Sequence, residues 1–190
     1  MANKDAAFGL KAIGKVGQNR DNQGLSEYSI AASASAIYQN DPVQMLDTGT
    51  IGVSNTSGNV LIGSLNGVFY TDASTSKPRW ANHLEASNTA TDIVGFVADD
   101  PYERFEVQSD NTGASDQTDI GNCADLVYAA GSAANYVSKA ELDDGTLTTL
   151  TAQLKIIGVS KDPENNDLGS ANTNFVVTIN EHFLKAGAGI

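Results

Sequence analysis

The sequence predicts an all-β protein, with a β-barrel or sandwich core, an extended N-terminal arm and little helix. Three observations lead to this fold class. The apolar runs are short and rich in β-branched residues. Clusters of Gly, Asn, Asp, Ser and Thr separate these runs at intervals of about 8 to 15 residues. The one stretch with helical composition, 126–142, is interrupted by Gly131 and Ser132, so we expect a turn or two of helix there at most.

The N-terminal half begins with two short strand candidates, 28–30 and 36–38, which are separated by small residues. The segment DPVQMLDTGTIGVSN then predicts two strands joined by a turn at Asp-Thr-Gly, 47–49. A further pair of strands is expected at 59–62 and 67–71. The Asn66-Gly67 dipeptide between them is the strongest turn signal in the chain.

The C-terminal half is organised around an acidic turn. Strands expected at 91–98 and 104–109 flank this turn, where a proline follows two carboxylates and stops the first strand. In the second strand, alternation places Phe105 and Val107 on a core face and residues 104, 106 and 108 on a solvated face. The remaining strands are expected at 124–129, 152–160 and 175–183.

Charge is divided unequally along the chain, whose net charge is −12. Residues 1–20 carry a net +3, and the rest of the chain carries −15. We therefore interpret residues 1–26 as an extended basic arm and residues 27–190 as a single β-rich domain. A frayed terminus with a few solubilising lysines explains the same charges equally well. The strongly acidic body argues against nucleic acid as a partner.

The sequence contains no membrane or secretion signal. The apolar runs are much shorter than the roughly 18 to 20 residues that span a bilayer, and the N-terminus has no sustained apolar segment of the kind that a signal peptide needs. We therefore expect a soluble protein made in the cytoplasm. The single cysteine, Cys123, allows no internal disulfide and is interpreted as a small apolar filler.

Patterns for catalysis and metal binding are incomplete throughout. The paired carboxylates, at 99–100 and 143–144, are adjacent in sequence, and adjacent residues of a strand point to opposite faces. His83 and His182 lack zinc-binding spacing. The loop 162–170 resembles a calcium loop in composition only. We therefore expect no enzymatic activity, no cofactor and no metal.

The order of several motifs resembles that of structural proteins of tailed bacteriophages, among them capsid decoration (cement) proteins. The resemblance spans nearly the whole chain, and DDPYERFEVQ is its most specific part. At 40–44, NDPVQ departs from the Gly-Asp of the pattern and adds a proline at a strand edge. The motifs are AAFGLKAIGKVG, SEYSIA, NDPVQML, IGSLNGVFYTD, SKPRWAN, TDIVGFVADDPYERFEVQSD, AQLKIIGVS and VTINEHFL.

The resemblance implies a non-enzymatic protein on the capsid surface of a virion, made in the host cytoplasm. Its partners would be the major capsid protein and itself, as a homo-oligomer for which analogy favours a trimer. No nucleic acid, membrane or cofactor is implied. The arm would bind capsid or neighbouring copies through Phe8, Leu10, Lys11, Ile13, Lys15 and Arg20. The acidic turn would hold two strands in register through Asp99, Asp100, Pro101 and Phe105, with Phe105 in the core.

Two alternatives remain open. The first is another virion component, such as a tail, connector or minor shell protein. The second is a glycan-binding adhesion module, which needs exposed aromatic side chains on one face. The candidates for that face are Tyr70, Trp80 and Tyr102.

Overall fold

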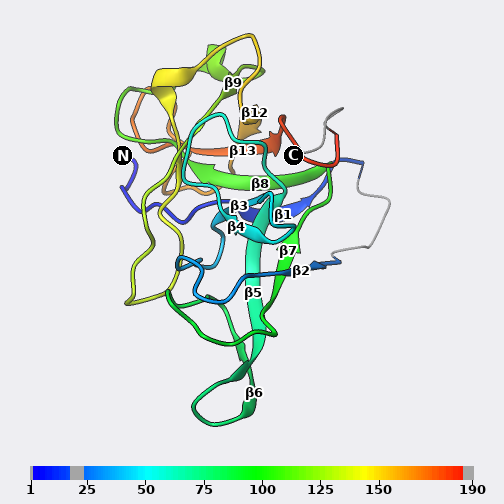
Figure 1. The fold of residues 1–190 in the computed structure, drawn as a ribbon. Coiled ribbons are helices and arrows are strands. Elements are labelled where there is room, and N and C mark those ends of the chain that lie inside the picture. The colour runs from blue at the N-terminus through cyan, green and yellow to red at the C-terminus, as the bar shows by residue number, and fades with distance from the viewer. Residues whose placement is uncertain (1, 18–23, 186–190) are drawn as a thin grey trace.

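Antiparallel β-strands make up most of the regular structure, as the sequence predicts. The computed structural model describes residues 2–17 and 24–185, in which the strands form two main sheets in a sandwich-like arrangement (Figure 1). Among these residues neither sheet closes on itself, and helix is limited to two short 3-10 turns. The elements are β1 (Lys11–Lys15), β2 (Ser26–Ser29), β3 (Pro42–Met45), β4 (Ile51–Val53), β5 (Gly63–Asp72), β6 (Lys77–Ala81), β7 (Val94–Ala98), β8 (Glu103–Gln108), η1 (Gln117–Asp119), β9 (Cys123–Ala124), β10 (Leu126–Val127), β11 (Glu141–Leu142), η2 (Asp144–Thr146), β12 (Leu154–Val159) and β13 (Asn174–Ile179).

The five-stranded sheet combines strands from both ends of the chain, in the order β1-β8-β13-β12-β9. The central part of this sheet pairs Lys11 of β1 with Glu106 of β8, and Phe105 of β8 with Val177 of β13. A hydrophobic cluster lies against the inner face and includes Phe105 and Phe175, which are both at most 1% exposed. Burial of these two aromatic rings is a large part of what holds the sheet to the rest of the molecule.

The six-stranded sheet is built from one continuous stretch of chain, residues 26–98. Its order is β2-β7-β5-β3-β4, with β6 paired to β5. A second hydrophobic cluster, which includes Ile51, Leu65 and Val97, lies beneath it. The ten-residue strand β5 extends beyond its neighbours, and its hairpin with β6 projects from the body at the end away from the five-stranded sheet (Figure 1).

The Asn66-Gly67 dipeptide is not a turn, so this prediction is wrong. Both residues lie within β5, where a β-bulge shifts the register against β7 between Leu65 and Gly67. Glycine suits this position because a Cβ atom would lie 3.0 Å from Trp80 Cζ2 and 3.0 Å from the backbone oxygen of Ala81, so these neighbours would have to shift to admit it. A close approach between strands and a tight turn both favour glycine, and sequence alone does not separate them.

The acidic turn at 99–102 does not hold two paired strands in register, which corrects a second expectation. β7 precedes the turn and belongs to the six-stranded sheet, whereas β8 follows it and belongs to the five-stranded sheet. The turn is therefore a corner at which the chain passes from one sheet to the other. The apolar alternation in β8 is as predicted, since Phe105 and Val107 are both buried in the core.

The described N-terminal residues do not project as a separate arm. Residues 11–15 form β1, an edge strand of the five-stranded sheet, and Leu10 is fully buried in the cluster beneath that sheet. An extended segment with exposed backbone groups and an apolar side chain gains both hydrogen bonds and burial by adding to a sheet. Residues 10–15 are therefore part of the sheet and its core, while the division at residue 26 stays a prediction.

The other expectations have mixed outcomes. The turn at 47–49 is present, with Gly49 at a φ of 74° and Gly49 N donating to the oxygen of Leu46 over 2.8 Å. The described chain forms no helix within 126–142, where β10 and β11 pair instead, and 36–38 contributes only an isolated bridge.

The sequence does not predict β6, because Pro78 and its charged neighbours suggest a loop. Proline is tolerated there since β6 pairs on one side only, with β5.

Candidate functional site

The corner between the sheets uses its first carboxylate to hold β2. Asp99 accepts hydrogen bonds from Ser26 Oγ at 2.8 Å and from the Tyr28 phenol at 2.7 Å. Burial, and then the neighbouring Asp99 carboxylate, raises the pKa of Tyr28. These bonds fix the edge strand of the six-stranded sheet to the residue at which the chain leaves that sheet.

The second carboxylate of the corner holds β1. Lys15 Nζ lies 2.7 Å from Asp100 Oδ2, and this bond holds the pKa of Asp100 below its ordinary value. The backbone nitrogen of Gly14 donates to Glu103 Oε1 over 3.2 Å, and burial raises the pKa of Glu103. Pro101 lies between these residues within the corner. The acidic segment is therefore engaged in bonds within its own chain and presents no pair of free carboxylates for acid and base chemistry.

The strand that follows the corner is less exposed than the sequence predicts. Glu106 is 9% exposed and accepts from Ser160 Oγ, and Lys11 Nζ lies 3.4 Å from its other carboxylate oxygen. Gln108 is 1% exposed and accepts from the backbone nitrogen of Ala6 over 2.7 Å. The expected solvated face is thus largely covered, because the N-terminal segment and the 160–174 region pack on it.

The expected arm residues do not form one free docking surface. Leu10 is fully buried, so it can anchor a partner only by leaving its own core. Phe8 is half-buried with Lys11 Nζ 6.0 Å from its ring centroid, and Ile13 is 39% exposed. Lys15 is bound to the corner. The sixth residue of the expected set, Arg20, lies outside the described residues.

The loop 162–170 holds the N-terminus in place. The side-chain amide of Asn3 donates to the oxygens of Asp167 and Ala171 at 3.0 Å each, and Lys4 Nζ lies 2.6 Å from Glu164 Oε2. In the described ranges, 2–17 and 24–185, no group of three or more His, Cys, Asp or Glu residues has the geometry to hold a metal.

The two histidines have structural surroundings. His83 is 6% exposed and stacks on Tyr136, with 3.7 Å between the ring centroids, and burial lowers the pKa of His83. His182 is 1% exposed, and its Nδ1 accepts from the backbone nitrogen of Leu184 over 3.1 Å. Cys123 is buried. His83 Nε2 also lies 3.7 Å from Glu85 Oε1, a carboxylate on the same loop.

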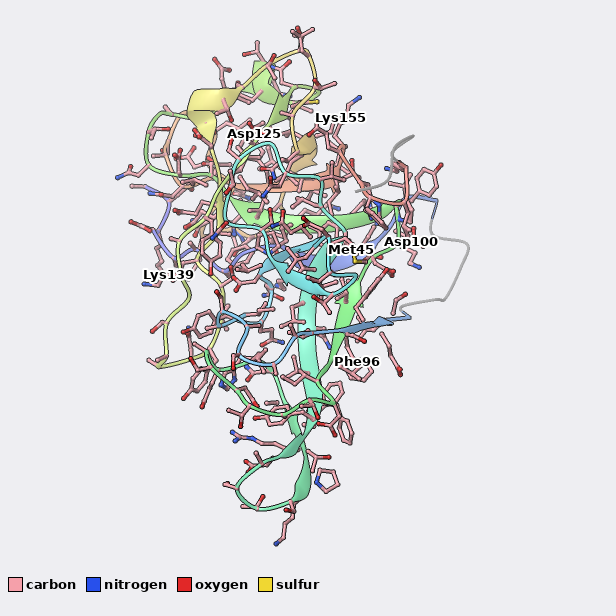
Figure 2. The ribbon with its side chains drawn as sticks, viewed as in Figure 1. Met45, Phe96, Asp100, Asp125, Lys139 and Lys155 are labelled. Atoms are coloured by element: carbon pink, nitrogen blue, oxygen red, sulfur yellow. The ribbon has the colours of Figure 1, made fainter. Side chains whose placement is uncertain are left out.

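An exposed aromatic cluster lies on the outer face of the six-stranded sheet, and we call Phe69, Trp80 and Phe96 the aromatic patch. Phe69 of β5 is directly opposite Trp80 of β6, and they are 40% and 55% exposed. Trp80 also packs against Phe96 of β7, with ring centroids 4.6 Å apart and tilted by 50°. Figure 2 shows Phe96 on β7 near the base of the hairpin. Gly67 lies between them, which lets the indole approach the backbone of β5.

Sequence reasoning found one member of this patch. Of the three expected aromatics, Tyr70 is 5% exposed and faces the core, while Tyr102 is 62% exposed and lies in the corner. Strand alternation contained the missing signal: in GVFYT, Phe69 and Tyr70 must point to opposite faces, so a buried Tyr70 implies an outward Phe69.

The patch is the strongest candidate site that the described residues offer. In the same residues no helix is long and apolar enough to cross a membrane. Neither a protein-family model, nor a curated protein, nor a solved structure matches this chain.

Proposed function

We propose that this chain is a non-enzymatic capsid decoration (cement) protein, which binds the outer surface of a phage head through the aromatic patch. The observation that carries the proposal is the exposure of Trp80 and Phe69 together on a projecting hairpin of an acidic protein. Clustered exposed aromatic rings mark interaction sites, because leaving them in water costs free energy that a partner recovers. Trp in particular is enriched among the residues that dominate binding energy.

The mode of action follows from mass action. A protein that binds the expanded shell and not its dissociated subunits stabilises the shell. Each contact can be weak, since many copies act on one particle and a copy that touches two subunits gains effective concentration. The rest of the surface, on a chain of net charge −12, would face solvent and keep particles apart.

The N-terminal segment has a different part in this proposal from the free arm that the sequence suggests. Leu10 and Lys15 hold it to the body, so it completes the five-stranded sheet. Its exposed residues, such as Ile13, remain available to a neighbouring copy. We further propose a closed homo-oligomer, with a trimer as the state suited to local three-fold positions on a shell.

Co-sedimentation with expanded, undecorated phage heads tests the proposal. Wild-type protein should saturate at on the order of hundreds of copies per head, as expected for a shell-wide lattice. Trp80→Ala should bind at least about tenfold more weakly, and Tyr102→Ala, which removes an exposed aromatic from the corner, should bind as wild type. Equal binding by Trp80→Ala contradicts the proposed surface. Saturation at about six to twelve copies would instead assign the chain to the tail or connector.

Carbohydrate binding at the same patch is the second candidate. The exposed indole of Trp80 is suited to stacking against the apolar face of a sugar ring. Since the chain has one tryptophan, its fluorescence reports directly on the patch. Quenching or a blue shift with maltoheptaose or chitotetraose, and no binding to heads, would favour an adhesion module over a cement protein.

A further inference from the structure

A groove of about 490 Å³ lies on the outer face of the five-stranded sheet, opposite its hydrophobic core. Its lining combines apolar side chains from three strands with cationic groups. Ile13 and Ile157 are each 39% exposed there, so this face of the sheet is partly apolar and uncovered. We call it the cationic groove, and the residues that define it are Ile13, Arg104, Ile157, Lys161 and Val176.

Arg104 lines the groove, and the described residues provide no partner for its charge. It lies on the interior strand β8, directly opposite Gly14 on β1 and Thr178 on β13. Its Nε atom is buried and has no hydrogen-bond partner, and the described residues offer its guanidinium no ion pair. A buried arginine donor that lacks an acceptor costs free energy, which an incoming acceptor restores.

The one carboxylate in the lining of the groove is already engaged. Glu106 is two residues from Arg104 and lines the same groove, but its oxygens are bound to Ser160 Oγ and Lys11 Nζ. Lys161 belongs to the lining of the groove. Lys155 of β12 is opposite Thr178 of β13, which is opposite Arg104, so Lys155 lies in the same row of the sheet, two strands from Arg104. This face is therefore locally cationic on a chain of net charge −12.

We propose that the cationic groove binds an extended acidic segment of a partner polypeptide. Arg104 receives a carboxylate, for which its planar fork of donors is suited. The apolar side chains at 13, 157 and 176 contact an apolar neighbour of that carboxylate, and Lys161 and Lys155 attract the segment by charge complementarity. The groove and the aromatic patch lie on different sheets, so this proposal stands or fails independently of capsid binding at the patch.

A polypeptide fits the groove better than a nucleic acid. Nucleic-acid affinity depends on neutralising many phosphates, and the surrounding surface of this acidic chain repels a polyanion. A segment with one or two carboxylates and alternating apolar residues matches both the single unpartnered guanidinium and the apolar floor. An extended strand also presents alternate side chains to one face, as the groove requires.

Titration of the full-length, isotope-labelled protein by NMR tests the proposal. The probe is a blocked octapeptide of alternating Glu and Val, and the matched control replaces every Glu with Gln. We expect saturable shifts confined to amides of β1, β8, β12 and β13, with at least about tenfold weaker binding of the Gln peptide. Arg104→Gln should weaken Glu-peptide binding by at least about tenfold, and Lys77→Gln, on the distant β6, should leave it unchanged.

A second variant shows whether weaker binding by Arg104→Gln comes from the lost charge or from a folding defect. Lys161→Glu reverses an exposed rim charge and should also weaken the Glu peptide, while its spectrum outside the groove stays that of the wild type. Three results overturn the proposal: no shifts at about 1 mM peptide, equal affinity for the Glu and Gln peptides, or undiminished binding by both variants. Tighter binding of inorganic phosphate or of a DNA duplex than of the peptide also overturns it, since the groove would then be a site for phosphate.

Discussion

Lys15 of the N-terminal strand lies 2.7 Å from Asp100 of the corner, so a cation expected to meet a partner is bound within its own chain. We predict that Lys15→Met and Asp100→Asn each lower the free energy of unfolding by less than about 1 kcal/mol, since both side chains retain some exposure. A double-mutant cycle by urea denaturation should give a coupling of about 0.5 kcal/mol that falls with added salt. Zero coupling at low salt would show that the pair is not formed in solution.

Leu10→Ala should lower the free energy of unfolding by about 2 to 5 kcal/mol, because the side chain is fully buried and its loss leaves a cavity. Val16→Ala is the matched change in the same segment, and should cost less than about 0.5 kcal/mol since Val16 is 53% exposed. Urea denaturation of both variants separates an integrated strand from a free arm. A free arm predicts that the two changes are equally harmless.

Tyr28→Phe should destabilise the protein by about 1 to 2 kcal/mol, because Asp99 loses one of the two hydroxyl donors to its buried carboxylate. Tyr102→Phe, at an exposed site, serves as the control. Spectrophotometric titration adds a second readout. The pKa of Tyr28 is raised, and burial also raises the pKa of Tyr128 to about 12, so the late-ionising absorbance of the wild type should contain both groups. In Tyr28→Phe this absorbance should lose the Tyr28 part and keep that of Tyr128.

Asp144→Asn should stabilise the protein above neutral pH. Both carboxylate oxygens of Asp144 are buried without a hydrogen-bond partner among the described residues. Burial, and then the charges of Asp110 and Asp119, raises the pKa of Asp144 to about 7. The folded state therefore binds more protons than the unfolded state between the ordinary pKa, near 3.8, and about 7, so stability falls as pH rises through that window.

The asparagine variant should flatten this slope and gain about 1 to 2 kcal/mol at pH 8, a figure reduced for solvent screening at a half-buried site. Some slope should remain, because burial also raises the pKa of Glu141 to about 7 and that of Asp41 to about 6. Thermal or urea unfolding from pH 4 to 8 measures both effects. A variant with an unaltered slope and lower stability at pH 8 contradicts the account.

Gly63→Ala should cost more than about 3 kcal/mol, since a Cβ at this position would lie 2.0 Å from the backbone oxygen of Ala98. Relief would require β5 to move away from β7. Gly158→Ala is the control, because a Cβ there meets nothing within 4 Å. Urea denaturation should show a change within about 0.5 kcal/mol for the control; similar losses in the two variants would argue against the close approach of the strands.

The sequence predicts those features that depend on local composition and alternation. Short β-branched runs indicate an all-β fold, and the turn at Gly49 and the burial of Phe105 follow from turn chemistry and strand period. The wrong predictions concern which strands meet. Asn66-Gly67 has the composition of a turn, and the close approach of Gly67 to Trp80, which explains the glycine inside a strand, depends on tertiary packing. The corner at 99–102 has the composition of a hairpin turn, and the sequence does not reveal that the chain changes sheet there.

The candidate surfaces were less accessible to sequence reasoning. Trp80 was found by residue type, but its partners Phe69 and Phe96 come from strands whose pairing is needed to bring them together. From the sequence, Arg104 is expected to form an ion pair with a nearby carboxylate such as Glu106. In the structure Glu106 binds Ser160 and Lys11 instead, and only this shows that Arg104 is left without a partner among the described residues.

The strand order of the two sheets has a consequence for synthesis on the ribosome. The six-stranded sheet uses residues 26–98 alone, so all of its strands are available once that stretch has emerged. In the five-stranded sheet, β8 lies between β1 and β13, so it has both neighbours only after β13 has been made. Such distant pairings slow folding. In the nascent chain the six-stranded sheet would therefore be complete before the five-stranded one, and the edge of β8 that later pairs with β13 would be open to association with other chains until β13 has emerged.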